Sequence, residues 1–101
     1  MEYRKLGNTG REVSVIALGC EGFVQDTSLA KKFIDMAEDA GVNYFDLFSP
    51  DPEARSALGE ALKGRREKFI IQSHISSVWK NGQYERSRDI DDVREIGRAH
   101  V

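Results

Sequence analysis

The stretch Gly41-Val42-Asn43-Tyr44-Phe45-Asp46 decides the fold. Its glycine suits a helix end, its apolar residues suit a short strand, and an aspartate stands where that strand ends. A second unit repeats this order, since Gly64 ends a short helix and the apolar run 69–71 emerges as Gln72-Ser73-His74. The repeat predicts a candidate active site, because polar groups at the carboxyl ends of parallel strands carry the chemistry of many α/β enzymes.

A further strand and helix are predicted upstream. The run Val15-Ile16-Ala17-Leu18-Gly19 is almost continuously apolar, which is typical of a parallel strand buried on both faces. Asp26 or Thr27 can cap a helix that ends at Gly41. A period near 3.6 predicts the face of this helix that covers the sheet: Leu29, Phe33, Met36 or Ala37, and Ala40.

The second helix has a clear start. Asp51 can accept hydrogen bonds from free backbone N–H groups, Pro52 suits the first helical position, and Glu53 favours the positive end of the helix dipole. Its predicted apolar face is Ala54, Leu58, Ala61 and Leu62. Strands that alternate with helices in this way predict right-handed crossovers and a parallel sheet.

The two ends of the chain differ from this pattern. Segments 3–6 and 12–15 flank Gly7-Asn8-Thr9-Gly10, which predicts a small hairpin. Residues 76–88 are interpreted as a polar loop around Trp79, and Asp89 as the cap of a third helix.

Composition limits the class of protein. The 101 residues are 40% hydrophobic and 32% charged with a net charge of −2, which indicates one small globular domain at most and disfavours nucleic-acid binding. No apolar run approaches the roughly 20 residues of a membrane span, and the first residues do not resemble a signal peptide. A single cysteine, Cys20, forms no internal disulfide. These features predict a cytoplasmic protein without a membrane partner.

Four separated segments, in the same order, resemble the N-terminal part of the aldo/keto reductase family: 1–10, 13–20, 43–46 and 58–68. The likeness covers residues 1–94. It implies an α/β fold, namely the N-terminal part of a (β/α)8 TIM barrel with a leading β-hairpin, the barrel being incomplete because a closed one takes about 250 residues. It also implies an oxidoreductase that reduces aldehydes or ketones with NADP(H) or NAD(H), although this fragment is expected to be inactive by itself.

The end of the chain does not fit the resemblance. The segment Ile96-Gly97-Arg98-Ala99-His100-Val101 looks like one reading frame of an adapter oligonucleotide used in short-read sequencing libraries. Residues 95–101 are therefore interpreted as a non-native read-through tail, the alternative being a genuine frayed C-terminus.

The resemblance also implies a catalytic arrangement. Family members deliver a hydride to a carbonyl carbon while a Tyr protonates the oxygen, a Lys paired with an Asp lowers the pKa of that Tyr, and a His assists from a later strand. Asp46 matches the family's Asp. Asp51 occupies the Tyr position and is better explained as a helix cap, whereas His74 occupies the Lys position. The fourth position lies beyond this chain.

Three interpretations of these departures compete. In the first, Asp46 orients His74, which donates a proton to the substrate carbonyl, since histidines exchange protons near neutral pH. In the second, the chain is a catalytically degenerate module that binds a nicotinamide or another metabolite as a sensor or partner-binding protein. In the third, Cys20 joins this pair in a zinc or iron site, but no short ligand spacing supports it. The first interpretation is the prediction adopted here, with no metal.

Cofactor contacts are predicted for three residues. Gly19 and Cys20 sit where the family passes its backbone close to the nicotinamide ring, and Asp46 lies beside them. The family's phosphate and adenine contacts come from later strands, so the sequence does not separate NADPH from NADH. Trp79 could line the pocket of a small carbonyl substrate, or it could pack against the protein and hold the loop in place. Oligomeric state is left open.

Overall fold

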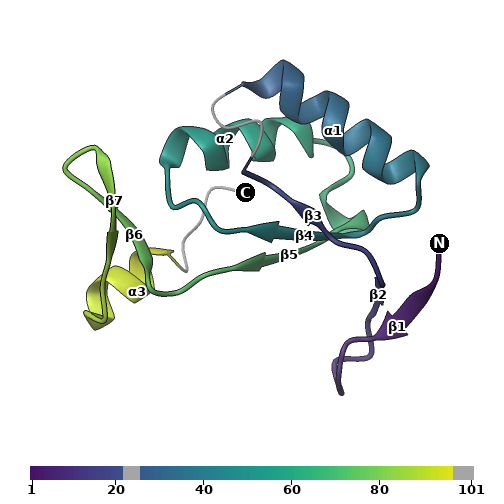
Figure 1. Ribbon diagram of the computed structural model, residues 1–101, viewed down its shortest axis with the longest axis horizontal. Coiled ribbons are helices and arrows are strands. Elements are labelled where there is room, and N and C mark those ends of the chain that lie inside the picture. The colour runs from purple at the N-terminus through teal and green to yellow at the C-terminus, as the bar shows by residue number, and fades with distance from the viewer. Residues whose placement is uncertain (22–25, 97–101) are drawn as a thin grey trace.

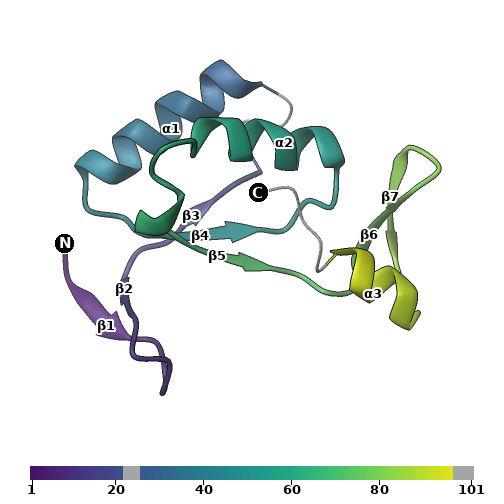
Figure 2. The same ribbon diagram turned by 180° about the vertical axis from the view of Figure 1, so that it is seen from behind.

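The chain folds around a small, open, parallel β-sheet (Figure 1). The computed structural model describes residues 1–21 and 26–96. Three parallel strands pair in the order β3 (Leu18–Gly19), β4 (Tyr44–Leu47) and β5 (Ile70–Ser73). Two helices connect them, α1 (Thr27–Asp39) and α2 (Pro52–Ala61), and both views place these helices on the same side of the sheet (Figures 1 and 2). The prediction of an α/β protein with a parallel sheet is confirmed in this coarse form.

The hydrophobic core lies between the sheet and the two helices. Phe45 and Leu47 of β4 belong to it and are 0% and 1% exposed. The Phe45 ring stacks on Phe69, with 4.8 Å between the ring centroids. The face predicted for α2 is confirmed, because all of its members are buried: Ala54, Leu58, Ala61 and Leu62. A 3-10 turn, Arg66–Lys68, leads from this helix to β5.

The face predicted for α1 is largely wrong. Ala30, Ile34 and Ala37 are the buried residues of this helix, whereas Met36 is 69% exposed. Two apolar stripes run along α1 one residue apart, and the prediction followed the one with the larger side chains. The small alanines let the helix axis approach the sheet closely, and Ile34 fills the space between them. The helix cap is as predicted, since the Asp26 side chain accepts a hydrogen bond from the backbone of Leu29.

The N-terminal hairpin is confirmed and is tied to the start of β4. Its strands are β1 (Tyr3–Lys5) and β2 (Glu12–Ser14), which pair antiparallel. The Tyr3 hydroxyl donates to the carbonyl of Gly41 at 2.6 Å, and the side chain of Asn43 accepts from the backbone N–H of Ser14 at 2.8 Å. Gly41 has a φ of +82°, and a methyl group on it would stand 2.9 Å from the Tyr3 hydroxyl. A glycine is therefore required there for the turn and for this close approach.

The strand predicted at 15–19 is shorter and more exposed than expected. Only Leu18 and Gly19 join the sheet, and Val15 and Ile16 are 48% and 61% exposed. The reason is a competing partner: the backbone N–H of Val15 donates to the carbonyl of Glu2 at 2.9 Å and so extends the N-terminal hairpin. The first half of the apolar run therefore belongs to the hairpin.

The loop predicted at 76–88 is wrong, because this segment forms a second hairpin. Strands β6 (Ser77–Lys80) and β7 (Gln83–Arg86) pair antiparallel. The two turn residues, Asn81 and Gly82, have φ angles of 53° and 74°. An Asn-Gly pair adopts such positive angles readily and favours the tight turns of two-residue hairpins.

The third helix, α3 (Ile90–Ile96), begins where predicted. The Asp89 side chain accepts from the backbone N–H of Asp91 at 2.8 Å, and Lys80 of β6 pairs with Asp92 at 2.8 Å. The tail predicted at 95–101 starts within the last turn of this helix, and its remainder, 97–101, lies outside the described residues. No described helix combines the length and apolar character needed to span a membrane.

Candidate active site

A histidine and an aspartate meet at the carboxyl ends of neighbouring strands. Asp46 lies in β4 and His74 directly follows β5, and 2.7 Å separates His74 Nε2 from Asp46 Oδ1. Because an ionised carboxylate only accepts hydrogen bonds, Nε2 of His74 is the donor in this contact. Both side chains are part-exposed, at 36% and 44%, so a small molecule can reach them. The sequence-based prediction that these two groups share one rim of the sheet is confirmed, while their catalytic role remains a prediction.

Strand alternation and register explain this meeting. Phe45 and Leu47 are buried under the helices, so Asp46 belongs to the opposite face of β4. In the parallel register Asp46 is opposite Gln72, and His74 comes two residues later at the strand end. Tyr44 lies two residues before Asp46 on the same face and hydrogen-bonds Gln72, one layer deeper, as the sequence predicts.

A cavity of about 340 Å³ opens beside His74. The Phe48 ring forms its inner wall, at a centroid distance of 5.1 Å from the His74 ring and 5.6 Å from the Tyr84 ring. The residues that line the cavity come from the end of β5 and from the second hairpin: Phe48, His74, Ile75, Ser76, Ser77, Tyr84 and Arg86. Trp79 is absent from this lining, and Tyr84, its partner across the hairpin, is present.

Cys20 and Gly19 lie next to Asp46 through the backbone. The backbone N–H of Cys20 donates to the carbonyl of Asp46 at 3.0 Å, and Gly19 is paired with Asp46 in the sheet. The Cys20 thiol is 1% exposed within the core, where burial, assisted by the negative charge of Asp46, raises its pKa to about 12. Only the backbone at these two positions is therefore available to a cofactor.

The described residues give no support to the metal interpretation. Within residues 1–21 and 26–96 no three histidine, cysteine or acidic side chains are grouped as metal ligands are. Cys20 is held on the core side of the sheet, whereas Asp46 and His74 meet on the other face.

Asp51, at the position of the family's Tyr, is a helix cap as predicted. Its Oδ1 atom accepts from the backbone N–H of Glu53 at 2.9 Å, and the residue is only 6% exposed. It offers neither a hydroxyl nor access to a substrate. The position therefore serves the start of α2 rather than proton transfer.

Arg55 is a buried residue of the site region that the sequence reasoning missed. Only 3% exposed, it donates from Nε to the carbonyl of Ser49 and from Nη2 to the Ser73 hydroxyl, each at 3.0 Å. Its Nη1 atom is buried without a hydrogen-bond partner in the described chain, and burial lowers the pKa of the guanidinium. The side chain thus links the loop after β4 to the residue that precedes His74. In the sequence, an arginine among the apolar residues of the α2 face is the feature that could have indicated this buried role.

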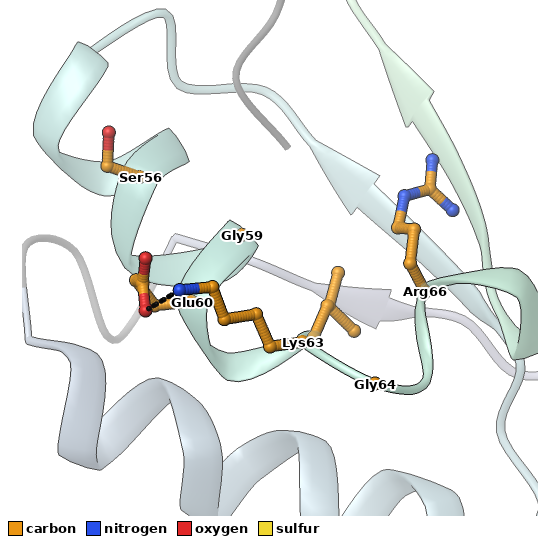
Figure 3. A pocket seen from close by; sticks show the side chains of 7 residues that line it. Ser56, Gly59, Glu60, Lys63, Gly64 and Arg66 are labelled. Carbon is orange, nitrogen blue, oxygen red and sulfur yellow. Dashed lines mark ion pairs between the residues drawn. The ribbon is translucent and has the colours of Figure 1, made fainter.

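A second cavity lies at the other end of the fold (Figure 3). It encloses about 420 Å³ at the C-terminal end of α2 and contains the exposed ion pair between Lys63 and Glu60, at 3.2 Å. Because α2 runs back from the end of β4 to the start of β5, this cavity is remote from His74. It is larger than the cavity beside His74 but lacks an acid–base pair in contact with an aromatic wall.

The raised pKa of Cys20 leads to an expected result. The thiolate is the reactive form of cysteine, and the folded protein keeps this thiol neutral and buried. We expect iodoacetamide at pH 8 to leave Cys20 unmodified in the native protein and to alkylate it in urea, as measured by mass spectrometry of its peptide. Rapid alkylation of the native protein would contradict the buried position.

Comparisons with known proteins find similarity to oxidoreductases. No family model matches the chain. It is 29% identical over 84 residues to the uncharacterized oxidoreductase YqkF of Bacillus subtilis (strain 168), a match that covers 81% of this chain and 28% of the relative. A putative aldo-keto reductase from Pseudomonas aeruginosa superposes with a TM-score of 0.79 at 29% identity, covering 95% of this chain and 39% of that one.

A second solved structure shows the same fold. An aldo-keto reductase from Bacillus halodurans, in its holo form, superposes with a TM-score of 0.81 at 24% identity and covers 97% of this chain. The chain spans 34% of that structure and less than two fifths of the Pseudomonas one. It is thus similar in sequence and structure to a fragment of the aldo-keto reductase chain.

Proposed function

We propose that this chain, whose structural neighbours are aldo-keto reductases, forms the N-terminal part of a cytoplasmic, NAD(P)H-dependent oxidoreductase that reduces aldehydes or ketones. On this proposal residues 1–94 supply the leading hairpin and the first strands of a (β/α)8 barrel, and residues 95–101 are not native. The open edges of β3 and β5 among the described residues support the barrel, because closure would pair them.

The observation that carries the proposal is the hydrogen bond between His74 and Asp46. A nicotinamide cofactor supplies the hydride when bound. His74, protonated at Nδ1, donates a proton to the carbonyl oxygen, and Asp46 holds the ring through Nε2 and stabilises its positive charge. The Phe48 ring packs against the imidazole in an edge-to-face contact and helps to fix its position.

The residues near this pair are compatible with a cofactor. A Cβ atom built on Gly19 would meet nothing within 4 Å, so the backbone there has open space in front of it. Gly19 and Cys20 would contact the nicotinamide through main-chain atoms, with Asp46 beside them. The buried Cys20 thiol takes no part.

A second function is favoured by one observation. Asp51 replaces the family's Tyr and is engaged as a helix cap, so the site has no tyrosine at that position. The alternative is a degenerate module that binds a nicotinamide or another metabolite and acts as a sensor or partner-binding protein.

The experiment that separates the two functions uses the full-length parent of this chain. We expect the purified protein to oxidise NADPH or NADH when aldehydes or ketones are added, and not in their absence. Calorimetric titration with each cofactor is measured in parallel. Cofactor binding without turnover over a broad carbonyl panel would favour the degenerate module, and absence of both binding and turnover would refute the proposal.

A further inference from the structure

We propose that the cavity beside His74 takes a carbonyl substrate that carries an anionic group, and that Arg86 and Arg88 hold the anion. This inference rests on the proposed function and names its substrate class. The carbonyl end would lie at His74, and the carboxylate or phosphate end would lie along the second hairpin.

Two adjoining cavities provide the space. The cavity beside His74 shares Ser76 and Arg86 with a second one of about 330 Å³, which is lined by Ser76, Arg86, Ser87 and Arg88. The shared residues place the two cavities next to each other. On this proposal an elongated small molecule lies along Ser76 and Arg86, with one end at His74 and the other at the guanidinium of Arg88.

The charges in this region favour an anion. Over the described ranges 1–21 and 26–96, neither Arg86 nor Arg88 forms an ion pair with a carboxylate, in contrast to Arg65, which contacts Asp35 and Glu38. Acidic side chains are nearby but occupied: Asp92 pairs with Lys80 and accepts from the Ser87 hydroxyl, and Asp89 caps α3. Two guanidinium groups are thus left at the cavity wall for a ligand.

The rest of the wall suits the carbonyl half of such a substrate. Phe48 and Tyr84 present two aromatic rings 5.6 Å apart beside the imidazole. Arg86 Nε donates to the Tyr84 hydroxyl at 3.4 Å, so the guanidinium lies next to the aromatic part of the wall. A flat, conjugated carbonyl compound with an anionic end therefore matches both halves.

The test compares matched substrates in the full-length parent. The probes are para-carboxybenzaldehyde, its uncharged methyl ester, and para-formylphenyl phosphate, assayed by cofactor oxidation and, in parallel, by calorimetric binding. We expect the acid or the phosphate to have a KM about tenfold or more below that of the ester, since a charge-assisted contact is worth about that factor. Preference for the phosphate over the carboxylate, or the reverse, identifies which anion the site selects.

Substitutions of the two arginines test whether they cause the preference for an anionic substrate. Replacing both residues, Arg86→Gln and Arg88→Gln, is expected to abolish the preference by raising the KM for the anionic probe about tenfold more than the KM for the ester. Arg86→Lys should retain part of the preference, and Arg11→Gln, a matched exposed arginine of the N-terminal hairpin, should change nothing. Equal KM and equal binding for acid and ester, or a preference that survives the double variant, would overturn the inference. If no carbonyl is turned over, the proposed function fails, and calorimetry alone then decides whether the anion site exists.

Discussion

Replacing His74 with alanine is expected to lower kcat for carbonyl reduction by about two to four orders of magnitude, the range of general acid catalysis. His74 contacts Asp46 at 2.7 Å and lines the cavity at the rim of the parallel sheet. Its loss removes the proposed proton donor while the core, which lies on the other face of the sheet, stays intact. The measurement is steady-state kinetics of the full-length parent with the best substrate of the panel.

Two matched variants distinguish a chemical role from a structural one. His74→Gln keeps a hydrogen-bonding side chain of similar length but exchanges no proton, so it should be as inactive as His74→Ala. Asp46→Asn should lower kcat less than the loss of His74, because an amide still contacts the ring but no longer stabilises its charge. The double variant, His74→Ala with Asp46→Ala, should be no slower than His74→Ala, since paired residues act as a unit. Activity that survives in the double variant would refute the catalytic assignment.

The sequence was sufficient to predict this pair because its placement depends on local rules. Two apolar runs that follow helix-ending glycines predict parallel strands, and parallel strands bring their carboxyl ends to one edge. Alternation then places Asp46 on the face opposite Phe45. Neither step requires knowledge of long-range packing.

The lining of the cavity could not be predicted in the same way. Tyr84 and Arg86 come to the cavity beside His74 through the second hairpin, whereas the sequence-based interpretation of residues 76–88 is a polar loop around Trp79. The Asn81-Gly82 pair is the sequence signal for a tight turn, and both residues have positive φ angles. Even with that turn recognised, the contact of Phe48 with Tyr84 depends on how the hairpin packs, which local sequence does not specify.

The face of α1 shows a similar limit. Two apolar stripes lie one residue apart, and the 3.6-residue period fits the one with Leu29 and Phe33 as well as the one that is buried. The buried stripe contains Ala30 and Ala37, because small side chains fit where a helix packs tightly against other elements of the core. The helix propensity of single residues does not predict which face is buried, because burial depends on how the helix packs against other elements.

The second large effect is expected on stability, and it comes from the buried side chain of Phe45. Phe45→Ala is expected to lower the free energy of unfolding of the full-length parent by about 3–5 kcal/mol, the range for a buried aromatic replaced by alanine. Phe45 is fully buried, stacks on Phe69 and lies directly before Asp46, so the cavity left behind opens under the strand that carries the site. The midpoint of urea unfolding, at unchanged slope, measures the change.

Phe45→Leu serves as the graded control for this prediction. Leucine keeps most of the apolar volume and loses only the stacked ring, so it should cost less than about 1.5 kcal/mol. Because Asp46 follows Phe45 in the same strand, the alanine variant should also lower kcat at temperatures where it is still folded, whereas the leucine variant should not. A cost below about 1 kcal/mol for Phe45→Ala would mean that β4 does not face the core in solution. The opposite face, with Asp46 and His74, would then not be the one exposed to substrate.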